Sequence, residues 1–451
     1  MRILNISCSY FPSNIGGTEV YVHNLSQELS SRGHEVFISY IGSFHEKGKA
    51  EFRRNEYVYE GIPVLAIERN SCRFRTAEIY CSVKSDFYRI FREYLHEIKP
   101  EVIHFHHISP AYSLAQMEVA REMKIPVILT YHSPTITCAH SDLLYHDDSV
   151  CGGKIDHKAC LVCFLTKYKI PLLLARGWSN LPGRLAHIIA NLSGKLKFDF
   201  PLTTFLQLPW FFREEERLLN RSFEMTSHFV AVSQWVYNLL LRNNIPPQKI
   251  TLCRQGVGRI PQIVRKHKDS RTLTIGSISR IHRHKGIDLL IKAFTMIPAQ
   301  YNIELLIYGS FQTQADRRYY LNLRRQSEGD KRIKWLGLLP DKERFQALSE
   351  LDVLTIPSRW LESGPLVLLE AWAVGTPVIG SRLGGLAELI EDGKGGLLFE
   401  SENAGQLAKI IIGIYKEDGL LERIKAGIPK VRLMQEVADE MEDLYRNTRG
   451  I

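Results

Sequence analysis

Strand-like and helical patterns alternate along the chain in two successive sets. In the first half, apolar strand-like runs stand at 3–7, 35–40, 64–67, 102–105, 127–131 and 228–232, with helical patterns at 18–31 and 81–98. In the second half, strand-like runs stand at 273–278, 304–308, 333–335, 353–356 and 378–379, with helical patterns at 286–294, 341–350, 365–374 and 386–390. Such alternation is typical of parallel sheets covered by helices on both faces. We therefore predict two doubly wound, Rossmann-like α/β domains.

The pattern also predicts where the domains begin and end. We expect an N-terminal domain over 1–260, a C-terminal domain over 271–430, and a helix over 431–451 that packs back on the N-terminal domain. The basic, turn-rich stretch 258–271 is the expected linker. In open parallel sheets, ligands bind beyond the carboxyl ends of the strands. We therefore expect the two sheets to face each other across a cleft that holds the active site.

Composition narrows the class of protein. The chain has 451 residues, of which 45% are hydrophobic and 24% charged, and this excludes a disordered chain. The formal net charge of +9 suits nucleotide, phosphate or anionic-membrane partners, but it is too diffuse for nucleic-acid binding. The sequence has no run of about 18 apolar residues, so we predict no membrane-spanning helix. The first residues resemble a strand rather than a signal peptide, so we expect a cytoplasmic protein.

Two loops that follow predicted strands carry features of anion sites. Gly16 and Gly17 open the first helix, where a backbone without side chains allows close approach of a ligand and the helix N-terminus favours an anion. The alternative is a plain tight turn with Thr18 as the N-cap. After the first strand of the second half, Arg280 and Lys285 flank a basic loop that suits a diphosphate. Its alternative is a solvated basic loop.

Two glutamates eight positions apart give the strongest local signal. Glu362 lies in a loop, and Glu370 lies in an apolar helix. An unpartnered charge at Glu370 would be costly, so this carboxylate needs a partner. Paired ribose hydroxyls are one candidate, and a structural ion pair is the other.

In this order, the motifs resemble family 4 glycosyltransferases, which are retaining enzymes of the GT-B architecture that use nucleotide-sugar donors. The resemblance covers nearly the whole chain and is carried by Gly16-Gly17-Thr18-Glu19, Arg280 with Lys285, Glu362 with Glu370, Gly375-Thr376-Pro377-Val378, and Gly384-Gly385 with Glu388. It implies that Arg280 and Lys285 bind the donor diphosphate, that Glu370 binds the ribose and that Glu362 binds the donor sugar. It also places His132 at the family's active-site histidine, near the sugar and the acceptor; a structural histidine is the alternative.

One position departs from the family pattern. The family often has glycine three residues after the first glutamate, where backbone amides face the sugar. Here that position is Pro365, which has no N–H group. The backbone amides of Gly364 and Leu366 remain as the expected donors to the sugar.

The resemblance implies a retaining transferase that moves a sugar to a glycan or lipid-linked acceptor in cell-surface polysaccharide or glycolipid synthesis. The chain has no Asp-x-Asp motif, so we expect no catalytic divalent metal. We also see no second carboxylate where a double displacement would need one, which favours same-face transfer assisted by the leaving diphosphate. The alternatives are a GT-B sugar-nucleotide epimerase or hydrolase, and a non-catalytic GT-B scaffold.

Half of the cysteines fall in a polar insert at 138–163. They are Cys138, Cys151, Cys160 and Cys163, and the last two form a C-x-x-C pair. Four thiolates would hold a structural zinc ion, and structural zinc contributes folding energy to a segment that lacks its own core. An iron–sulfur cluster uses the same ligands, and free thiols are the third alternative. A subset of the resembled family has a similarly spaced cysteine insert.

The following segment, 164–219, combines apolar and basic residues. Its aromatic residues include Trp210, Phe211 and Phe212, and acidic residues are nearly absent before Glu214. This composition suits peripheral contact with the anionic inner face of the cell membrane. The alternative is an apolar substructure packed on the N-terminal domain, or a partner interface.

Overall fold

The computed structural model describes residues 1–12, 16–46, 51–70, 86–145, 149–195, 201–263 and 272–449. The chain divides into two compact units. Unit 1 comprises residues 1–232, 236–253 and 438–451, and unit 2 comprises residues 233–235 and 254–437. Within the described ranges, no helix has both the length and the apolar character needed to cross a membrane.

Unit 1 is built on an eight-stranded sheet in the order β3-β4-β2-β1-β5-β6-β7-β8. The strands are β1 (Arg2–Ser7), β2 (Glu35–Phe44), β3 (Phe52–Tyr59), β4 (Ile62–Asn70), β5 (Val102–Phe105), β6 (Val127–Tyr131), β7 (His228–Ala231) and β8 (Ile250–Leu252). All neighbouring strands pair in parallel except β3 and β4. The chain order reverses between β1 and β5, which makes this pair the switch point where doubly wound sheets bind ligands.

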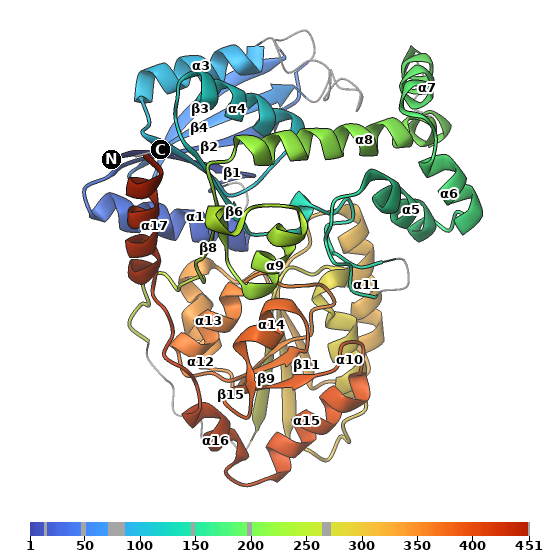
Figure 1. Ribbon diagram of the computed structural model, residues 1–451. Coiled ribbons are helices and arrows are strands. Elements are labelled where there is room, and N and C mark those ends of the chain that lie inside the picture. The colour runs from blue at the N-terminus through green and yellow to red at the C-terminus, as the bar shows by residue number, and fades with distance from the viewer. Residues whose placement is uncertain are drawn as a thin grey trace. The chain divides into compact units, whose positions relative to one another are not determined.

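Helices cover both faces of the unit 1 sheet. Figure 1 shows α1 (Gly17–Ser31) and α17 (Met434–Arg449) on one side of the sheet, and α3 (Asp86–Ile98) and α4 (Pro110–Glu122) on the other. Arg32, which follows α1, pairs with Asp439 at 2.6 Å and Glu442 at 3.2 Å, both on α17. The end of the chain is therefore tied to the first helix by ion pairs.

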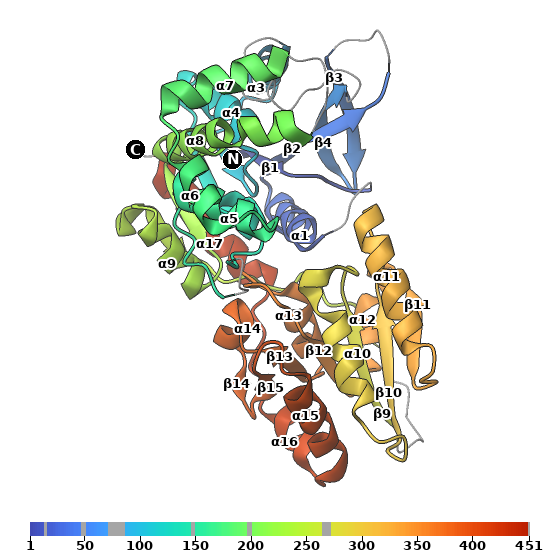
Figure 2. The ribbon, with the colours of Figure 1, turned by 90° about the vertical axis from the view of Figure 1, so that its right-hand side faces the viewer.

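Four helices follow one another between β6 and β7. They are α5 (His157–Lys167), α6 (Leu172–Ser179), α7 (Gly183–Lys195) and α8 (Pro201–Met225), and α9 (Gln234–Arg242) follows β7. Figure 2 shows α5, α6 and α7 grouped beside α8. Leu161, Leu165, Ala175 and Phe212 form a small buried core among α5, α6 and α8. These helices therefore have a satellite core of their own.

Unit 2 is built on a seven-stranded sheet in the order β11-β10-β9-β12-β13-β15-β14. The strands are β9 (Leu273–Ile278), β10 (Ile303–Tyr308), β11 (Ile333–Gly337), β12 (Val353–Ile356), β13 (Val378–Ser381), β14 (Glu391–Asp392) and β15 (Gly395–Phe399). The helices are α10 (Ile287–Thr295), α11 (Gln314–Ser327), α12 (Arg344–Ser349), α13 (Leu366–Ala373), α14 (Gly384–Leu389), α15 (Ala404–Lys416) and α16 (Leu420–Ala426). All strand pairs are parallel, and the chain order reverses between β9 and β12.

Alternate strand residues of unit 2 enter two different cores. Val353 packs with α10, α11 and α15, whereas its neighbour Leu354 packs with α12, α13 and α14. Ile379 and Val378 divide in the same way. A sheet buried on both faces needs apolar residues at consecutive positions, which explains the unbroken apolar runs in the sequence. The predicted fold class, two Rossmann-like α/β domains, is confirmed.

Several elements differ from the sequence-based expectation. The expected helix 341–350 begins as a 3₁₀ turn, Asp341–Glu343, before α12. Strands β3 and β15 were not predicted, because β3 contains four consecutive polar residues at an edge of the sheet and β15 begins with two glycines. Parts of the expected linker (264–271), of the helix 81–98 (81–85), of the cysteine insert (146–148) and of the segment 164–219 (196–200) lie outside the described residues.

Candidate functional site

The predicted donor residues of unit 2 gather at its topological switch point. Arg280 and Lys285 follow β9, and Glu362 follows β12. These are the two strands between which the chain order reverses. Gly384 follows β13, the next strand across the sheet. Four residues from three separate segments of the sequence thus follow the carboxyl ends of three adjacent strands.

Lys285 and Glu362 form a short ion pair. The Lys285 Nζ atom lies 2.6 Å from Glu362 Oε1, and the Ser358 hydroxyl donates to the same oxygen at 2.7 Å. Lys285 also lies over the Trp360 ring, 4.8 Å from its centroid. Burial alone would raise the pKa of Glu362, but Lys285 and Ser358 hold it below its ordinary value. Glu362 is therefore a buried carboxylate that stays charged.

Gly286 allows the loop that carries Lys285 to approach the loop that carries Glu362. Its φ is 67°, in the left-handed region, and a Cβ atom there would lie 1.9 Å from the carbonyl oxygen of Pro357. Arg359 joins the same loops, because its guanidinium pairs with Asp288 of α10 and its backbone N–H donates to the His284 carbonyl at 2.8 Å. A side chain at 286 would separate Lys285 from Glu362.

Two hydrogen bonds hold the backbone carbonyl group of Glu362. Its carbonyl oxygen accepts from the Gly385 N–H at 2.6 Å and from Trp235 Nε1 at 2.9 Å. A Cβ atom on Gly384 or Gly385 would lie 2.8–3.0 Å from the Glu362 backbone. The glycine pair therefore serves the packing of the Glu362 loop. Glu388, from the same motif, accepts from the backbone N–H groups that begin α9, at 2.6 Å from Trp235 and 2.8 Å from Gln234.

The two remaining predicted donors to the sugar lie just beyond Glu362. Leu366 is the first residue of α13, and Pro365 caps this helix without a side-chain hydrogen bond. A Cβ atom on Gly364 would lie 2.5 Å from Gln255 Oε1, so a side chain there would require the Gln255 amide to move. The backbone amides of Gly364 and Leu366 stay predicted contacts to the sugar.

Glu370 has the ion-pair partner that its buried position requires. Arg344 Nη1 lies 3.1 Å from Glu370 Oε1, and the same guanidinium pairs with Asp341. Burial raises the pKa of Glu370 although Arg344 opposes this shift. The structural ion pair anticipated as an alternative is thus present. The ion pair with Arg344 occupies Oε1 of Glu370. Ribose binding by Glu370 stays a prediction.

Arg280 differs from Lys285 in exposure. Its side chain is exposed, and its Nη1 donates to Gln312 Oε1 at 2.9 Å. The Gln312 amide is neutral, so this contact does not offset the positive charge of the exposed Arg280 guanidinium. Its role at a diphosphate stays a prediction.

The predicted glycine pair of unit 1 follows β1, one of the two strands at its switch point. Gly16 is the N-cap of α1, so the alternative that Thr18 caps this helix is wrong. A Cβ atom on Gly16 would lie 2.7 Å from Glu19 Oε2. Glu19 is buried and accepts from the Ser9 hydroxyl at 2.6 Å and the Cys8 thiol at 2.9 Å. Gly17 has open space around it, and donor binding by this glycine pair stays a prediction.

His132 directly follows β6 and is buried in unit 1. Its Nε2 lies 3.1 Å from His106 Nδ1, and its ring centroid lies 4.6 Å from that of Tyr21. Burial lowers the pKa of His132 to about 3, so the imidazole is neutral near pH 7. His132 belongs to unit 1 and Glu362 to unit 2, and the expected cleft between the units stays a prediction.

Sequence reasoning missed several residues around these sites. In unit 1 they are His104, His106 and Asn5, and in unit 2 they are Arg344, Trp235 and Ser358. Of these residues, only His104 and His106 could have been identified from the sequence pattern. Two polar residues at alternate positions of an otherwise apolar strand indicate one polar face in a buried sheet.

The four cysteines of the insert lie close to one another. Cys160 and Cys163 are one turn apart on α5, and Cys138 lines a small cavity with Cys160. Cys163 Sγ lies 3.8 Å from the carbonyl oxygen of Leu144, and Leu144 pairs with the residue before Cys151. Among the described residues, however, no three Cys, His, Asp or Glu side chains are arranged to hold a metal ion. Metal binding would require the thiols to turn toward one point, and it stays a prediction.

Metal analysis of anaerobically purified protein tests this prediction. We expect about one zinc per chain, or iron with sulfide, and loss of that metal in a Cys160→Ser variant. A Cys253→Ser variant, which alters a buried cysteine outside the insert, should keep the metal. Metal-free protein with four alkylatable thiols in the insert would show that they are free thiols.

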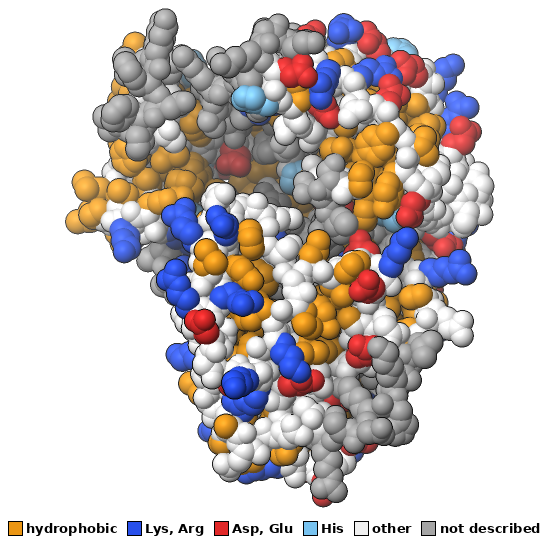
Figure 3. Space-filling view, turned by 180° about the vertical axis from the view of Figure 1, so that it is seen from behind, with side chains coloured by type: hydrophobic (Ala, Val, Ile, Leu, Met, Phe, Trp, Pro, Cys, Tyr) orange, Lys and Arg blue, Asp and Glu red, His pale blue; other side chains and the backbone are white. Residues whose placement is uncertain are grey.

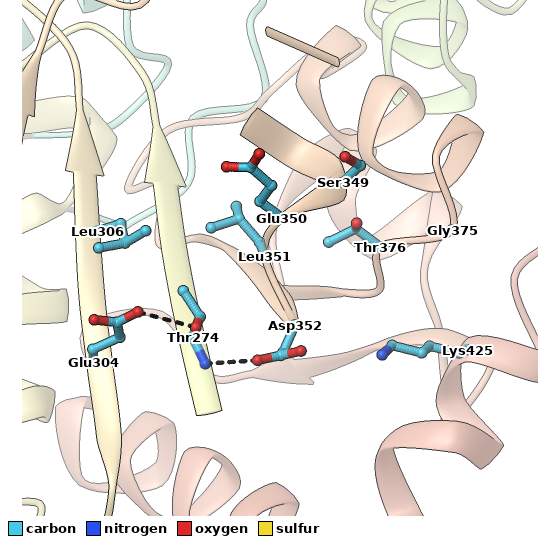
Figure 4. Close-up of a pocket in the computed structure, with 10 residues that line it drawn as sticks. All are labelled: Thr274, Glu304, Leu306, Ser349, Glu350, Leu351, Asp352, Gly375, Thr376 and Lys425. Carbon is cyan, nitrogen blue, oxygen red and sulfur yellow. Dashed lines mark hydrogen bonds between the residues drawn. The ribbon is translucent and has the colours of Figure 1, made fainter. Parts of the chain in front are cut away.

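A cavity of about 390 Å³ lies near the amino ends of central strands of the unit 2 sheet. Figure 4 shows that Thr274, at the start of β9, donates its N–H to Asp352 at 2.8 Å and its hydroxyl to Glu304 at 3.1 Å. Thr376, just before β13, lines the same cavity. These positions lie at or just before the starts of the strands, whereas the loops that carry Lys285 and Glu362 follow the strand ends.

Comparisons with known proteins match both halves of the chain. The sequence model described as "Glycosyl transferases group 1" matches residues 260–431, and that of "Glycosyltransferase Family 4" matches residues 15–148. A curated relative is the amylovoran biosynthesis glycosyltransferase AmsK of Erwinia amylovora, 27% identical over 44% of this chain. The match takes in 50% of that protein, so the chain spans about half the length of this relative.

Two solved structures share the fold over nearly the whole chain. The sucrose-phosphate synthase of Thermosynechococcus elongatus superposes with a TM-score of 0.64 and 18% identity, covering 99% of this chain and 98% of its own. Anabaena HepE, in complex with UDP and glucose, superposes with a TM-score of 0.61 and 14% identity, covering 99% of this chain and 100% of its own. At these identities the likeness shows the fold alone.

Proposed function

Because the chain belongs to the GT-B glycosyltransferase superfamily, we propose that it is a retaining glycosyltransferase with a nucleotide-sugar donor and a glycan or lipid-linked acceptor. The Erwinia relative, whose name assigns it to amylovoran biosynthesis, supports a role in cell-surface polysaccharide or glycolipid synthesis. The UDP and glucose bound to the Anabaena neighbour support a nucleotide-sugar donor.

The Lys285–Glu362 pair is the observation that carries this proposal. An ammonium and a charged carboxylate lie 2.6 Å apart after the two strands at the switch point. A bound donor would offer each of them a better-matched partner. The diphosphate would attract Lys285, and the hydroxyls of the sugar would donate to Glu362. Donor binding would then replace the internal ion pair with two contacts to the ligand.

The same charges suit the departure of a nucleoside diphosphate. As the bond between the sugar and the diphosphate breaks, negative charge grows on the leaving group, and Lys285 and Arg280 would neutralise it. On the same face of the sugar, the acceptor hydroxyl oxygen then bonds to the anomeric carbon while a diphosphate oxygen takes its proton. This sequence retains the configuration at the sugar without a covalent intermediate on the enzyme.

Incubation with a labelled donor, first alone and then with a lipid extract, tests the function. A transferase produces a labelled glycolipid or glycan only when the acceptor is present. Epimerisation or rapid hydrolysis of the donor alone would favour the epimerase or hydrolase, and an unchanged donor in both reactions would favour the scaffold.

We further propose that α6 and α7 form a docking surface for an anionic bilayer. Their exposed apolar residues, with those just before α6, are Tyr168, Leu172, Leu173, Leu174, Leu185, Ile188 and Leu192. Leu173 is 82% exposed and Leu174 67%, which is unusual for side chains of this kind. Figure 3 shows hydrophobic side chains gathered at the left edge of the view, where α5 and α6 lie.

Charge supports an anionic lipid surface as the occupant. The stretch from His157 to Lys195 contains no acidic residue and six lysines and arginines: Lys158, Lys167, Lys169, Arg176, Arg184 and Lys195. A basic, apolar helical surface suits the boundary between anionic headgroups and acyl chains. The expected role of Phe211 and Phe212 in lipid contact is wrong, because both are buried, 8% and 7% exposed, within the protein.

Liposome sedimentation tests this surface. Binding should require anionic lipid, weaken as salt is added and fall by about tenfold or more in a Leu173→Ser/Leu174→Ser variant, since each exposed leucine that enters the bilayer gains roughly 1.5–3 kcal/mol. The matched control is Leu338→Ser, because Leu338 is a 73% exposed leucine of unit 2. Binding that is indifferent to lipid charge would contradict the proposal.

A further inference from the structure

A polar ladder crosses three neighbouring strands of unit 1. It consists of Asn5 on β1, His104 on β5, Thr130 on β6, and His106 and His132 directly after β5 and β6. Asn5 is opposite His104 in the strand register. Because side chains of a strand alternate between faces, His106 and His132 continue the same face. These polar groups lie on one face of an otherwise apolar sheet.

The ladder is enclosed except at His132, which is 7% exposed. Asn5, His104 and Thr130 are 0% exposed and His106 is 1% exposed. The helices α1 and α17, which lie on the same side of the sheet in Figure 1, supply further partners. Tyr21 of α1 packs against His106, and Tyr445 of α17 lies 2.7 Å from His104 Nδ1. Buried polar groups need hydrogen-bond partners, so each contact in the ladder constrains where the protons lie.

The proton positions can be followed from Asn5. Its Nδ2 donates to the Ser26 hydroxyl at 2.9 Å, so its Oδ1, 3.3 Å from His106 Nε2, needs a proton on that nitrogen. Burial lowers the pKa of His106 well below its ordinary value, so the ring is neutral and its Nδ1 accepts. The atom facing that acceptor is His132 Nε2, at 3.1 Å, which must donate.

We propose that Asn5 and His106 are positioning residues that fix His132 in the tautomer with its proton on Nε2 and its acceptor lone pair on Nδ1. This inference rests on the proposed function, in which His132 contacts the sugar and the acceptor. The tautomer decides which ring nitrogen of His132 donates and which accepts in its contacts with the substrate. His104 belongs to a separate branch, since its Nε2 lies 2.6 Å from the Thr130 hydroxyl and its Nδ1 faces Tyr445.

An Asn5→Asp variant tests the inference with little change of shape. A carboxylate facing His106 Nε2 favours the imidazolium form. Protonated His106 donates from both nitrogens, so His132 would have to accept at Nε2 and carry its proton on Nδ1. The titratable groups that face His106 are His104 on β5, His132 after β6 and Tyr21 on α1, and the wild-type environment keeps both of these histidines neutral.

Two readouts separate this inference from the proposed function. In wild-type protein, nitrogen NMR of labelled histidine, assigned with His132→Gln, should show the Nε2–H tautomer at His132. The ratio of Asn5→Asp to wild-type turnover should fall about tenfold from pH 8 to pH 6. A Thr130→Val control, which removes only the bond to His104, should leave the shape of the pH profile unchanged.

A proton on Nδ1 of His132 in the wild type, or an Asn5→Asp ratio that is constant with pH, would overturn the inference. Failure of the proposed function has a different signature, which is no sugar transfer by the wild type under any condition. In that case the NMR tautomer alone decides whether Asn5 and His106 set the state of His132.

Discussion

Replacing Glu362 with Gln should lower sugar transfer on the order of 100-fold while leaving nucleoside diphosphate binding intact or slightly stronger. The charged Glu362 carboxylate is the proposed partner of the donor sugar, where its contact tightens as positive charge develops on the ring. The diphosphate lacks that sugar and loses nothing. Moreover, the carboxylate competes for Lys285 through a contact of 2.6 Å, and the variant removes this competition. Calorimetry and initial rates measure the two effects separately.

The matched variant is Glu370→Gln, which alters the other carboxylate of the motif. If Glu370 holds the ribose, this variant weakens binding of donor and nucleoside diphosphate together, since both carry the ribose. If Glu370 is only the buried partner of Arg344, the variant lowers the melting temperature without a selective loss of nucleotide. Identical behaviour of the two variants, in either direction, would show that the assignment of their roles is wrong.

Replacing Lys285 with Ala should weaken nucleoside diphosphate binding by roughly 10- to 150-fold, because a hydrogen bond to a charged group contributes about 1.5–3 kcal/mol. Binding of the nucleoside alone should change far less. Arg280→Ala should show the same selectivity with a smaller loss, since the Arg280 side chain is exposed to solvent. Equal losses for nucleoside and diphosphate would refute the assignment of these residues to the diphosphate.

A control is needed because Lys285→Ala also leaves Glu362 without its cation, which destabilises unit 2. Lys334→Ala breaks another short ion pair of this unit, 2.5 Å from Glu304, outside the switch-point loops. This control should bind nucleoside diphosphates as the wild type does. Thermal melts of both variants show whether loss of binding exceeds loss of stability.

The sequence predicted the central parallel strands well because strands buried on both faces are mainly apolar. The runs at 102–105, 127–131, 273–278 and 353–356 coincide with β5, β6, β9 and β12. These strands also flank or adjoin the switch points, so the loops after them could be identified before the fold was known. Strand β3 was missed because it pairs only with β4, and its mixed residues are those of an edge.

The partners of the site residues were beyond prediction because they come from distant segments. Lys285 and Glu362 were each identified, but their contact depends on how the loops after β9 and β12 meet at Gly286. Arg344 resembles any surface arginine until α12 and α13 pack together and bring it to Glu370. In the same way, Phe211 belongs to a segment whose composition suits lipid contact, and only the packing of α8 shows that this side chain is buried.

The central claim is that unit 2 binds a nucleotide sugar through the residues after β9 and β12. A thermal-shift screen over UDP, GDP, ADP and their sugars tests it most directly, because a ligand that binds only the native state raises the melting temperature. We expect one nucleoside diphosphate and its sugar to stabilise the wild type, and Lys285→Ala to remove the effect. No stabilisation by any of these nucleotides at millimolar concentration, or an equal effect in Lys285→Ala, would contradict it.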